Sequence, residues 1–296
     1  MTDFIKGVIV KAIGGFYYVS DGEKTFTCKI RGKLKRRDGG IMVGDYVNFS
    51  IVSGDQGVVE DILPRTNSMI RPKIANVNQG LIVLAAKDPE PDFMLLDRLL
   101  IFMQRAGVMP VICFNKNDLL KPEDKIYSEL QDYEEAGFMV VYASALTEQG
   151  RAQLHDVLAD KITVLAGPSG AGKSSILNLQ QQTARETGSV SQKLKRGRHT
   201  TRCVELLPLE GGWVADTPGF SRLDLPKDML PEELTDWYPE FRKLAGNCRF
   251  DGCRHHKEPG CAVKEALASE DISQGRYDRY LMLLQELIEM REQEYK

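Results

Sequence analysis

The chain has 296 residues and a formal net charge of −3, and 42% of its residues are hydrophobic and 27% charged. This length exceeds one typical domain, so we expect two or three, and the composition allows buried cores. The slightly acidic balance excludes a uniformly basic chain, so any binding to nucleic acid must come from local patches. No apolar run reaches the length of a membrane span and an acid lies near the start. We therefore expect no membrane segment, no signal peptide and a cytoplasmic location.

The first 62 residues hold short strand-like runs separated by glycine-containing turns. The runs cover residues 7–13, 16–20, 25–30, 46–51 and 57–62. Short strands at this spacing predict a small closed β-barrel of the OB type. Residues 67–78 are predicted to link this barrel to the next domain.

A basic loop, K-I-R-G-K-L-K-R-R at residues 29–37, lies between the third and fourth runs, with Phe16, Tyr17 and Tyr18 nearby in sequence. Such a loop on an OB-type barrel indicates contact with RNA, mainly through phosphates. A solvated charged hairpin is the other interpretation of this charge run.

From Gly80 onward, strand-like runs alternate with helical patterns, which predicts an α/β domain with a parallel sheet covered on both faces. The predicted strands are 81–86, 108–114, 138–142 and 162–166, and the predicted helices are about 92–106, 123–136 and 149–160.

The sequence G-P-S-G-A-G-K-S follows the last of these strands and precedes a helical run, which is the context of a Walker A phosphate loop. Gly167, Gly170 and Gly172 let the backbone bend until several N–H groups face one anion. Lys173 can reach the β- and γ-phosphates, and Ser174 can bind Mg²⁺. A chance glycine-rich turn is the alternative. The remaining nucleotide-binding positions that we assign to this loop are Pro168, Ser169, Ala171 and Ser175.

Two further loops indicate a preference for guanine. The second predicted strand ends in N-K-N-D, and the carboxylate of Asp118 can accept from the ring N–H and the exocyclic amine of guanine, which adenine does not offer. The stem of Lys116 can lie over the purine, and Asn115 can tie this loop to the phosphate loop. The third strand is followed by Ser144 and Ala145, which resemble a guanine loop that offers a backbone N–H to the guanine carbonyl.

Beyond the phosphate loop, R-G-R-H-T-T at residues 196–201 precedes a predicted hairpin, 202–209 with 213–215, that leads into D-T-P-G. We expect Asp216 to hold Mg²⁺ through a water and the Gly219 N–H to sense the γ-phosphate. Thr200 or Thr201 would close over Mg²⁺, and the sequence does not choose between them. A plain turn is the alternative for both threonines.

These motifs have an unusual order. In an ordinary small GTPase the phosphate loop comes first and N-K-x-D follows D-x-x-G. Here N-K-N-D precedes the phosphate loop and D-T-P-G comes last. The order indicates a circular permutation, in which the same sheet is built from a chain cut between its third and fourth strands.

A cluster of three cysteines and two histidines lies between residues 248 and 261. Cys248, Cys253, His255 and Cys261 form a Cys₃His set suited to tetrahedral Zn²⁺, and four protein ligands indicate a structural site. His256 could take the place of His255, and a redox role is the alternative. Residues 231–244 and 273–296 around the cluster are predicted helices, with so little core that the metal would supply folding free energy.

The motif order, the R-G-R-H-T-T segment, the barrel and the Cys/His cluster together resemble the RsgA (YjeQ or YloQ) family of circularly permuted, ribosome-small-subunit-dependent GTPases, over essentially the whole chain. The resemblance implies an OB-fold RNA-binding domain at 1–66, a circularly permuted α/β P-loop GTPase domain at 67–222 and a mainly α zinc-binding domain at 223–296. It also implies GTP hydrolysis with Mg²⁺, one structural Zn²⁺ on the four cluster residues, and late maturation of the small ribosomal subunit with contacts to its rRNA. We expect a monomer.

The position after D-T-P-G is Phe220, where Ras-like enzymes have the glutamine that orients the attacking water. A phenylalanine cannot form that hydrogen bond, so intrinsic turnover should be slow. His199 is the candidate substitute because it can order a water and titrates near neutral pH, and the family resemblance points to the same histidine. An exposed, idle loop histidine is the alternative. The catalytic set that we expect is His199, Lys173, Thr200 and Thr201.

Two other functional classes remain open. The chain could be an RNA-binding protein that uses GTP only as a conformational ligand, or a P-loop enzyme that uses ATP, against which Asp118 argues. Because the segment after Gly219 leads directly into the C-terminal domain, we also hypothesise that the GTP state sets the orientation of that domain.

Overall fold

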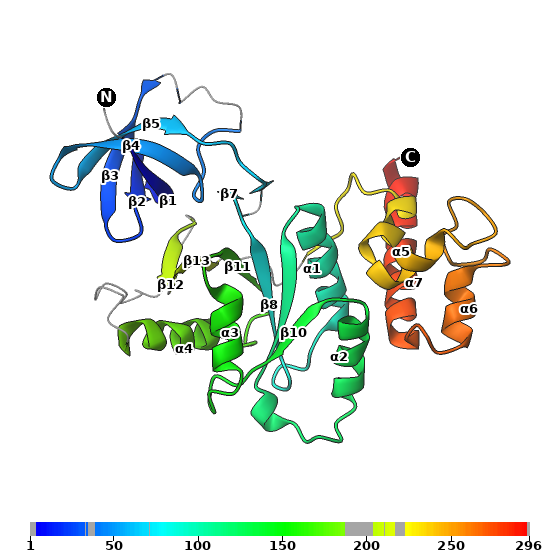
Figure 1. Cartoon of the computed structure of the whole chain (residues 1–296). Helices are drawn as coiled ribbons and strands as arrows, with labels where there is room; N and C mark the ends of the chain where they lie inside the picture. The colour runs from blue at the N-terminus through cyan, green and yellow to red at the C-terminus, as the bar shows by residue number, and fades with distance from the viewer. Residues whose placement is uncertain are drawn as a thin grey trace.

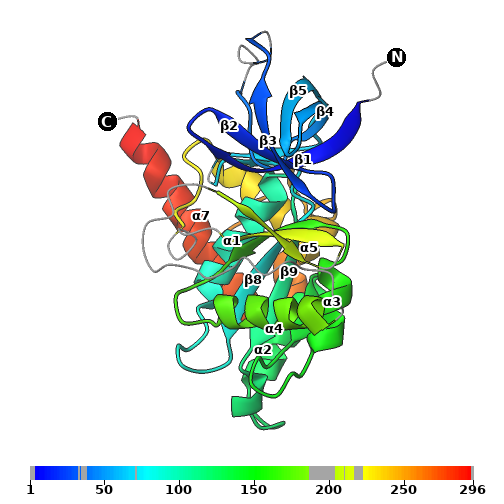
Figure 2. The ribbon, with the colours of Figure 1, turned by 90° about the vertical axis from the view of Figure 1, so that its left-hand side faces the viewer.

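The structure is a computed structural model that describes residues 4–32, 34, 39–70, 72–186, 204–209, 211–216 and 223–294. Figure 1 shows a β-barrel in blue, a central sheet with helices in cyan to green, and a helical C-terminal region in yellow to red. The view turned by 90° also places the barrel above the central sheet (Figure 2). None of the described helices combines the length and the apolar character that a membrane span requires.

The first five strands close into a barrel in the order β1-β2-β3-β5-β4. They are β1 (Ile5–Ile13), β2 (Phe16–Ser20), β3 (Thr25–Ile30), β4 (Tyr46–Ser53) and β5 (Gln56–Ile62). The predicted barrel is confirmed, with the predicted bounds for β2 and β3 and slightly longer β1, β4 and β5. Its interior is apolar, and the rings of Phe26 and Phe49 pack there with their centroids 5.1 Å apart.

Strand β1 joins two cores because its side chains alternate. Ile9 points into the barrel, whereas Val8 and Val10 pack into the hydrophobic cluster of the central domain. Lys11 adds an ion pair of 2.9 Å with Glu205, just before β12, and the two residues also form a backbone bridge. The barrel is therefore docked on the central domain through both apolar and polar contacts.

Residues 67–78, which were predicted to be a linker, form an ordered joint between the barrel and the central domain. Its strands β6 (Ser68–Met69) and β7 (Ile74–Ala75) pair antiparallel, and their methionine and isoleucine side chains are buried in the central cluster. The amide of Asn76 donates to the Gly44 carbonyl (2.9 Å) and accepts from the Thr66 N–H (2.9 Å). These bonds tie the joint to the barrel on one side, while its apolar side chains tie it to the central domain.

The central sheet has six strands in the order β10-β9-β8-β11-β13-β12. They are β8 (Gln79–Ala85), β9 (Met109–Asn115), β10 (Met139–Tyr142), β11 (Ile162–Ala166), β12 (Leu206–Leu209) and β13 (Gly212–Asp216). Neighbours pair in parallel except β12, which forms the predicted antiparallel hairpin with β13. Strand β8, the first of these along the chain, lies in the middle of the sheet. Strands β9 and β10 follow on one side of it, and β11, β13 and β12 lie on the other side. The carboxyl ends of the parallel strands therefore share one edge, where α/β folds place ligands.

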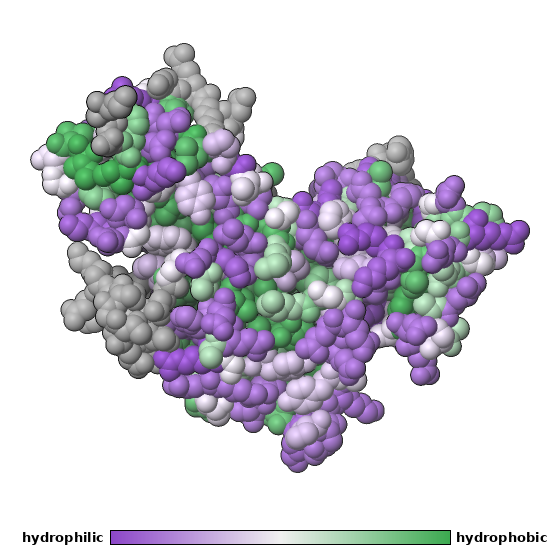
Figure 3. Space-filling view, viewed as in Figure 1, coloured by the Kyte–Doolittle hydropathy of each residue, from purple (hydrophilic) through white to green (hydrophobic). Residues whose placement is uncertain are grey.

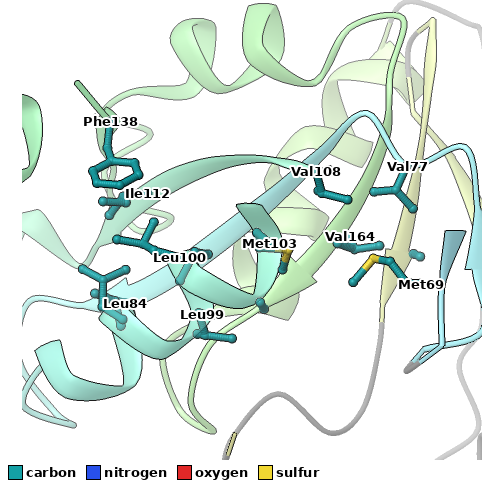
Figure 4. Packing of buried hydrophobic residues seen from close by; sticks show 14 of the residues in the cluster. Met69, Val77, Leu84, Leu99, Leu100, Met103, Val108, Ile112, Phe138 and Val164 are labelled. Carbon is teal, nitrogen blue, oxygen red and sulfur yellow. The ribbon is translucent and has the colours of Figure 1, made fainter. Parts of the chain in front are cut away.

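Helices cover both faces of this sheet, as predicted (Figure 1). They are α1 (Phe93–Arg105), α2 (Ile126–Glu135), α3 (Arg151–Leu158) and α4 (Lys173–Glu186), and a short 3-10 helix, η2 (Asn117–Leu119), follows β9. Alternate side chains of β8 point to opposite faces of the sheet. Ile82 and Leu84 pack with α1 and α2, and Leu81 and Val83 pack with α3 and α4. Figure 4 shows the first of these clusters, including Leu84.

Two of the helices are shorter than predicted for local reasons. Helix α2 starts late because Asp124 closes a turn by accepting from the Lys121 N–H at 2.9 Å. Helix α3 starts after Gly150, which has a φ of 72° and is so close to the Tyr142 carbonyl that a Cβ would lie 2.3 Å from its oxygen.

The C-terminal region is helical and corrects two predictions. Its elements are η3 (Pro231–Trp237), α5 (Pro239–Ala245), α6 (Ala262–Ala268) and α7 (Gln274–Glu294). The prediction of one helix over 231–244 is wrong because Pro239 disfavours the helical conformation at Tyr238, whose φ and ψ are −109° and 93°. The prediction of a very small core is also wrong: Phe241 and Tyr280 are fully buried in a cluster that extends to Ile101 of α1.

A buried carboxylate on α1 binds the C-terminal region to the central domain. Asp97 accepts hydrogen bonds from the hydroxyls of Tyr133 (2.7 Å) and Tyr238 (3.1 Å) and from the guanidinium groups of Arg276 and Arg279. The Arg276 guanidinium also lies over both tyrosine rings, 4.6 and 4.4 Å from their centroids. Burial is the largest single effect and lowers the pKa of Arg276, but Asp97, Glu240 and the two tyrosines together outweigh it, so this pKa lies well above its ordinary value.

We predict that Asp97→Ala destabilises the protein by about 3–5 kcal/mol, because it removes the buried acceptor of two tyrosines and two arginines and leaves Arg276 with Glu240 as its one remaining acidic partner among the described contacts. Urea unfolding of the whole chain measures this loss. The matched control is Asp228→Ala, which removes a carboxylate that pairs with Arg105 of the same helix but is 80% exposed, so the expected loss is below about 1 kcal/mol. Equal losses in the two variants would contradict the importance of the buried network.

Candidate nucleotide and zinc sites

The phosphate loop connects β11 to α4, so it lies between a strand and a helix as predicted. Gly167, Gly170 and Gly172 have φ values of 119°, 82° and 90°, which residues with a side chain rarely adopt. A Cβ on Gly167 would lie 2.1 Å from the Val83 carbonyl oxygen, and one on Gly172 would lie 2.2 Å from Nδ2 of Asn115. The fold therefore requires glycine at these two positions.

The ammonium of Lys173 stays close to this loop. It donates to the carbonyl oxygens of Gly167 (2.8 Å) and Pro168 (2.7 Å). The amides of the loop and the first turn of α4 add the positive end of the helix dipole, which favours an anion here. Ala171 is buried, and the exposed residues of the loop are Ser169, Gly170, Ser174 and Ser175.

Asn115 connects the phosphate loop to the guanine loop. Its side chain is buried, donates from Nδ2 to the Ala171 carbonyl (2.9 Å) and accepts at Oδ1 from the Ala145 N–H (3.2 Å). The sequence predicts the first of these contacts, whereas the second is new. One amide thus fixes the distance between the two loops.

The carboxylate of Asp118 is exposed but oriented by a buried neighbour. Ser144 donates its hydroxyl hydrogen to Asp118 Oδ1, and its oxygen accepts from the backbone N–H groups of Leu146 (3.2 Å) and Thr147 (3.1 Å). The hydroxyl is therefore held in place and can fix the carboxylate. Sequence reasoning assigned only a backbone role to this loop, because a two-residue motif carries no signal for the side-chain contact.

Lys116 has a left-handed backbone, with φ of 62° and ψ of 30°, at the start of η2. Its ammonium donates to the main-chain carbonyl of Asp88, in the turn between β8 and α1. This fixes both ends of the stem that the sequence predicts to lie over a purine. Nothing in the sequence marked Asp88 as part of this region.

The remaining predicted residues belong to the metal and switch region. Asp216 ends β13, and its backbone is in parallel register with Leu165, next to the phosphate loop. A serine hydroxyl at the start of α4 and a carboxylate at this strand end are oxygen ligands of the kind that Mg²⁺ binds. His199, Thr200, Thr201 and Gly219 lie outside the described residues.

The Cys/His cluster is brought together in the C-terminal region. The potential ligand atoms of Cys248, Cys253, His255 and Cys261 all lie within 4.8 Å of one another. His255 is buried and directs Nδ1 toward Sγ of Cys248 (3.6 Å) and Sγ of Cys261 (3.3 Å). His256 is exposed and does not belong to this group.

These distances fit a tetrahedral zinc ion. Zn–S and Zn–N bonds of about 2.3 and 2.0 Å separate neighbouring ligand atoms by roughly 3.5–3.8 Å. Burial raises the pKa of the Cys253 thiol to about 12 and also raises that of Cys261, and burial lowers the pKa of His255. Without a cation these groups would be neutral, and a bound Zn²⁺ would stabilise the thiolates.

Comparison with known proteins identifies the family. A family model described as "RsgA GTPase" matches residues 62–226, and one described as "RsgA N-terminal domain" matches residues 6–59. Two relatives are named "Small ribosomal subunit biogenesis GTPase RsgA". The one from Caldanaerobacter subterraneus subsp. tengcongensis is 43% identical over 99% of both chains. The one from Ruminiclostridium cellulolyticum is 46% identical over 95% of this chain and 93% of its own. The chain belongs to the RsgA family.

Two solved structures extend the match to the whole RsgA fold. The crystal structure of YloQ, described as a circularly permuted GTPase, has a TM-score of 0.81 and 37% identity and covers 97% of this chain and 96% of its own. The crystal structure of YjeQ from Thermotoga maritima has a TM-score of 0.83 and 34% identity, with coverage of 97% and 99%. The predicted fold, a barrel followed by a permuted GTPase domain and a helical region with a Cys/His cluster, is confirmed.

We predict that His255→Ala abolishes binding of one equivalent of zinc and lowers the melting temperature, because metal binding and folding are coupled. His256→Ala should keep both, since His256 lies outside the cluster. Metal analysis of the purified chains and thermal unfolding measure the two effects. Full zinc content in the His255 variant would exclude this ligand set.

We predict that Asp118→Asn weakens GTP binding by about a hundredfold or more and improves binding of xanthosine triphosphate, because a site built on hydrogen bonds rejects a base with the wrong donors. Titration with both nucleotides measures the change. Asp55→Asn, which changes an exposed carboxylate in the turn between β4 and β5 of the barrel, should leave both affinities unchanged. An unaltered preference for GTP in the Asp118 variant would place the base elsewhere.

Proposed function

We propose that this chain is a GTP hydrolase that acts in the biogenesis of the small ribosomal subunit. The proposal is carried by two linked observations. Asn115 ties the phosphate loop at Ala171 to the guanine loop at Ala145, and Ser144 of that guanine loop orients the Asp118 carboxylate. The relatives at 43% and 46% identity carry the corresponding name. Asp118 favours GTP over ATP, because adenine lacks the two donors that a carboxylate accepts.

The residues have distinct roles in this proposal. Backbone amides of the phosphate loop and the Lys173 ammonium bind the β- and γ-phosphates. Ser174 and Asp216 would hold Mg²⁺, which neutralises charge on the phosphates. Asp118 would read the guanine edge, whereas the Ala145 N–H is already donated to Oδ1 of Asn115. The Gly219 N–H and Thr200 or Thr201 would respond to the γ-phosphate.

Hydrolysis requires a group that orients water, and we propose His199 for this role. Phe220 occupies the position of the glutamine in Ras-like enzymes and cannot form the hydrogen bond. An imidazole that reaches the attacking water only in the complex with the partner would make the free enzyme slow.

The two flanking modules support the proposed contact with rRNA. Figure 3 shows them standing apart on either side of a hollow above the central domain, so both can reach one large partner. On the barrel, the Lys29 ammonium lies 5.8 Å from the ring of Phe16, which is 42% exposed. In the zinc region, the Arg249 guanidinium lies 5.5 Å from the ring of Phe250, which is 46% exposed. Exposed aromatic rings next to cations are suited to stack on bases and neutralise phosphates.

The remaining parts of the proposal concern the state of the chain. We propose a cytoplasmic monomer that carries one structural Zn²⁺ and has domains at 1–66, 67–222 and 223–296. The GTP-dependent orientation of the C-terminal domain stays a prediction.

We predict that purified small ribosomal subunits raise GTP turnover by about a hundredfold or more, since a supplied or repositioned catalytic group typically contributes 10²–10⁴. Phosphate release with and without subunits measures the effect. Large subunits serve as the control. A chain that binds GTP tightly but shows no stimulation would instead be an RNA-binding protein that uses GTP as a conformational ligand.

The same assay tests the histidine. His199→Ala should lower the stimulated rate by about a hundredfold while leaving GTP affinity unchanged. Unchanged stimulated turnover would exclude His199 from catalysis without affecting the assignment of the nucleotide site.

A further inference from the structure

The turn between β8 and α1, A-K-D-P-E-P at residues 86–91, lies against the nucleotide site although no motif marks it. The Asp88 carbonyl accepts a hydrogen bond from the Lys116 ammonium. Pro89 Cδ lies 3.3 Å from the position that a Cβ on Gly170 would occupy. We propose that this turn is a positioning element for the purine: it presents the stem of Lys116 as a preformed wall of the base pocket.

The stem of Lys116 is fixed at both of its ends. Its left-handed backbone fixes where the stem leaves the chain, and the bond to Asp88 fixes where the stem ends. A lysine stem that is free in solution loses rotamer freedom when a purine packs on it. A stem anchored at both ends has lost that freedom already, so binding of the base is favoured by preorganisation.

The Asp88 carbonyl lies in a turn that is held at both ends. The turn begins at Ala86, whose N–H donates to the Asn115 carbonyl at 2.8 Å. Lys87 spans from the turn to the Leu119 carbonyl at 3.3 Å. The turn ends at Asp92, which caps α1 by accepting from the Leu95 N–H. Both ends of the turn are therefore tied to the central domain, and the first end is bonded directly to the main chain of Asn115.

The backbone of Asp88 sets the direction of this carbonyl. Its φ is 49°, in the left-handed region that aspartate tolerates better than most residues and that β-branched residues avoid. The direction of its carbonyl depends on this conformation. The residue thus acts through its main chain, and glycine should replace it without loss.

This role differs from base reading. The stem of Lys116 contacts the face of a purine and not its edge, so the turn contributes to affinity and leaves the choice between bases to Asp118. The inference rests on the nucleotide site of the proposed function.

The test compares Asp88→Val with Asp88→Gly in the full-length chain, with GDP and inosine diphosphate as probes in calorimetric titrations. The valine variant should bind both about tenfold more weakly, which corresponds to a difference of 1.4 kcal/mol, with the GDP-to-IDP ratio unchanged. The glycine variant should bind both like the wild type. Thermal unfolding without nucleotide shows whether the variants fold.

A second background keeps the test decisive. Lys116→Met retains an apolar stem but removes the ammonium, so Asp88→Val should have no further effect in that variant. Equal loss in the valine and glycine variants, no loss in either, or additive losses with Lys116→Met would each overturn the inference. Failure of the wild-type chain to bind GDP would instead overturn the proposed function.

Discussion

The side-chain amide of Asn115 bridges loops that are far apart along the chain, and the geometry of the nucleotide site depends on it. Its donor reaches the Ala171 carbonyl, 56 positions away, and its acceptor receives the Ala145 N–H, 30 positions away. The amide is buried, so removal of one partner would leave a polar group unpaired, at a typical cost of about 1–3 kcal/mol. The tight contact with Gly172 leaves no room for a side chain there. Circular permutation is compatible with this site because the loops all extend from the carboxyl edge of one parallel sheet, whatever the order of its strands.

Helix α1 connects this site to the C-terminal region. The turn before α1 contacts Lys116 and the phosphate loop, and Asp97 within α1 holds Arg276 and Arg279 of α7. The network would oppose a separation of the C-terminal region from α1, because separation would break the hydrogen bonds that Arg276 and Arg279 donate to Asp97. The barrel is coupled at another point, through the ion pair between Lys11 and Glu205 beside β12.

Features with a short-range signal could be predicted from the sequence. Alternating strands between glycine turns gave the barrel, and motif order gave the permuted sheet. The pairing of Asp97 with Arg276 spans 179 positions and has no local pattern. The contact between Ser144 and Asp118 likewise appears only when two strand ends meet. Pro239 was a readable signal for the break between η3 and α5. The extent of the C-terminal core could not be predicted because it also includes Met94 and Ile101 of α1, which are far from it along the chain.

The choice between the two adjacent histidines also could not be made from the sequence. Spacing allows either His255 or His256 in the cluster, whereas the left-handed φ of 58° at His255 belongs to a backbone that directs Nδ1 toward the thiols. Backbone conformation of this kind follows from the packed structure around it, here the buried ring of Tyr280, 6.2 Å from the imidazole.

The most direct test of the account is a crystal structure of the chain with a non-hydrolysable GTP analogue. We expect the guanine edge to lie on the Asp118 carboxylate, with the stem of Lys116 on the face of the base, and the β- and γ-phosphates to lie on the amides of residues 168–174. A ligand bound elsewhere, or an Asp118 carboxylate turned away from the base, would contradict it.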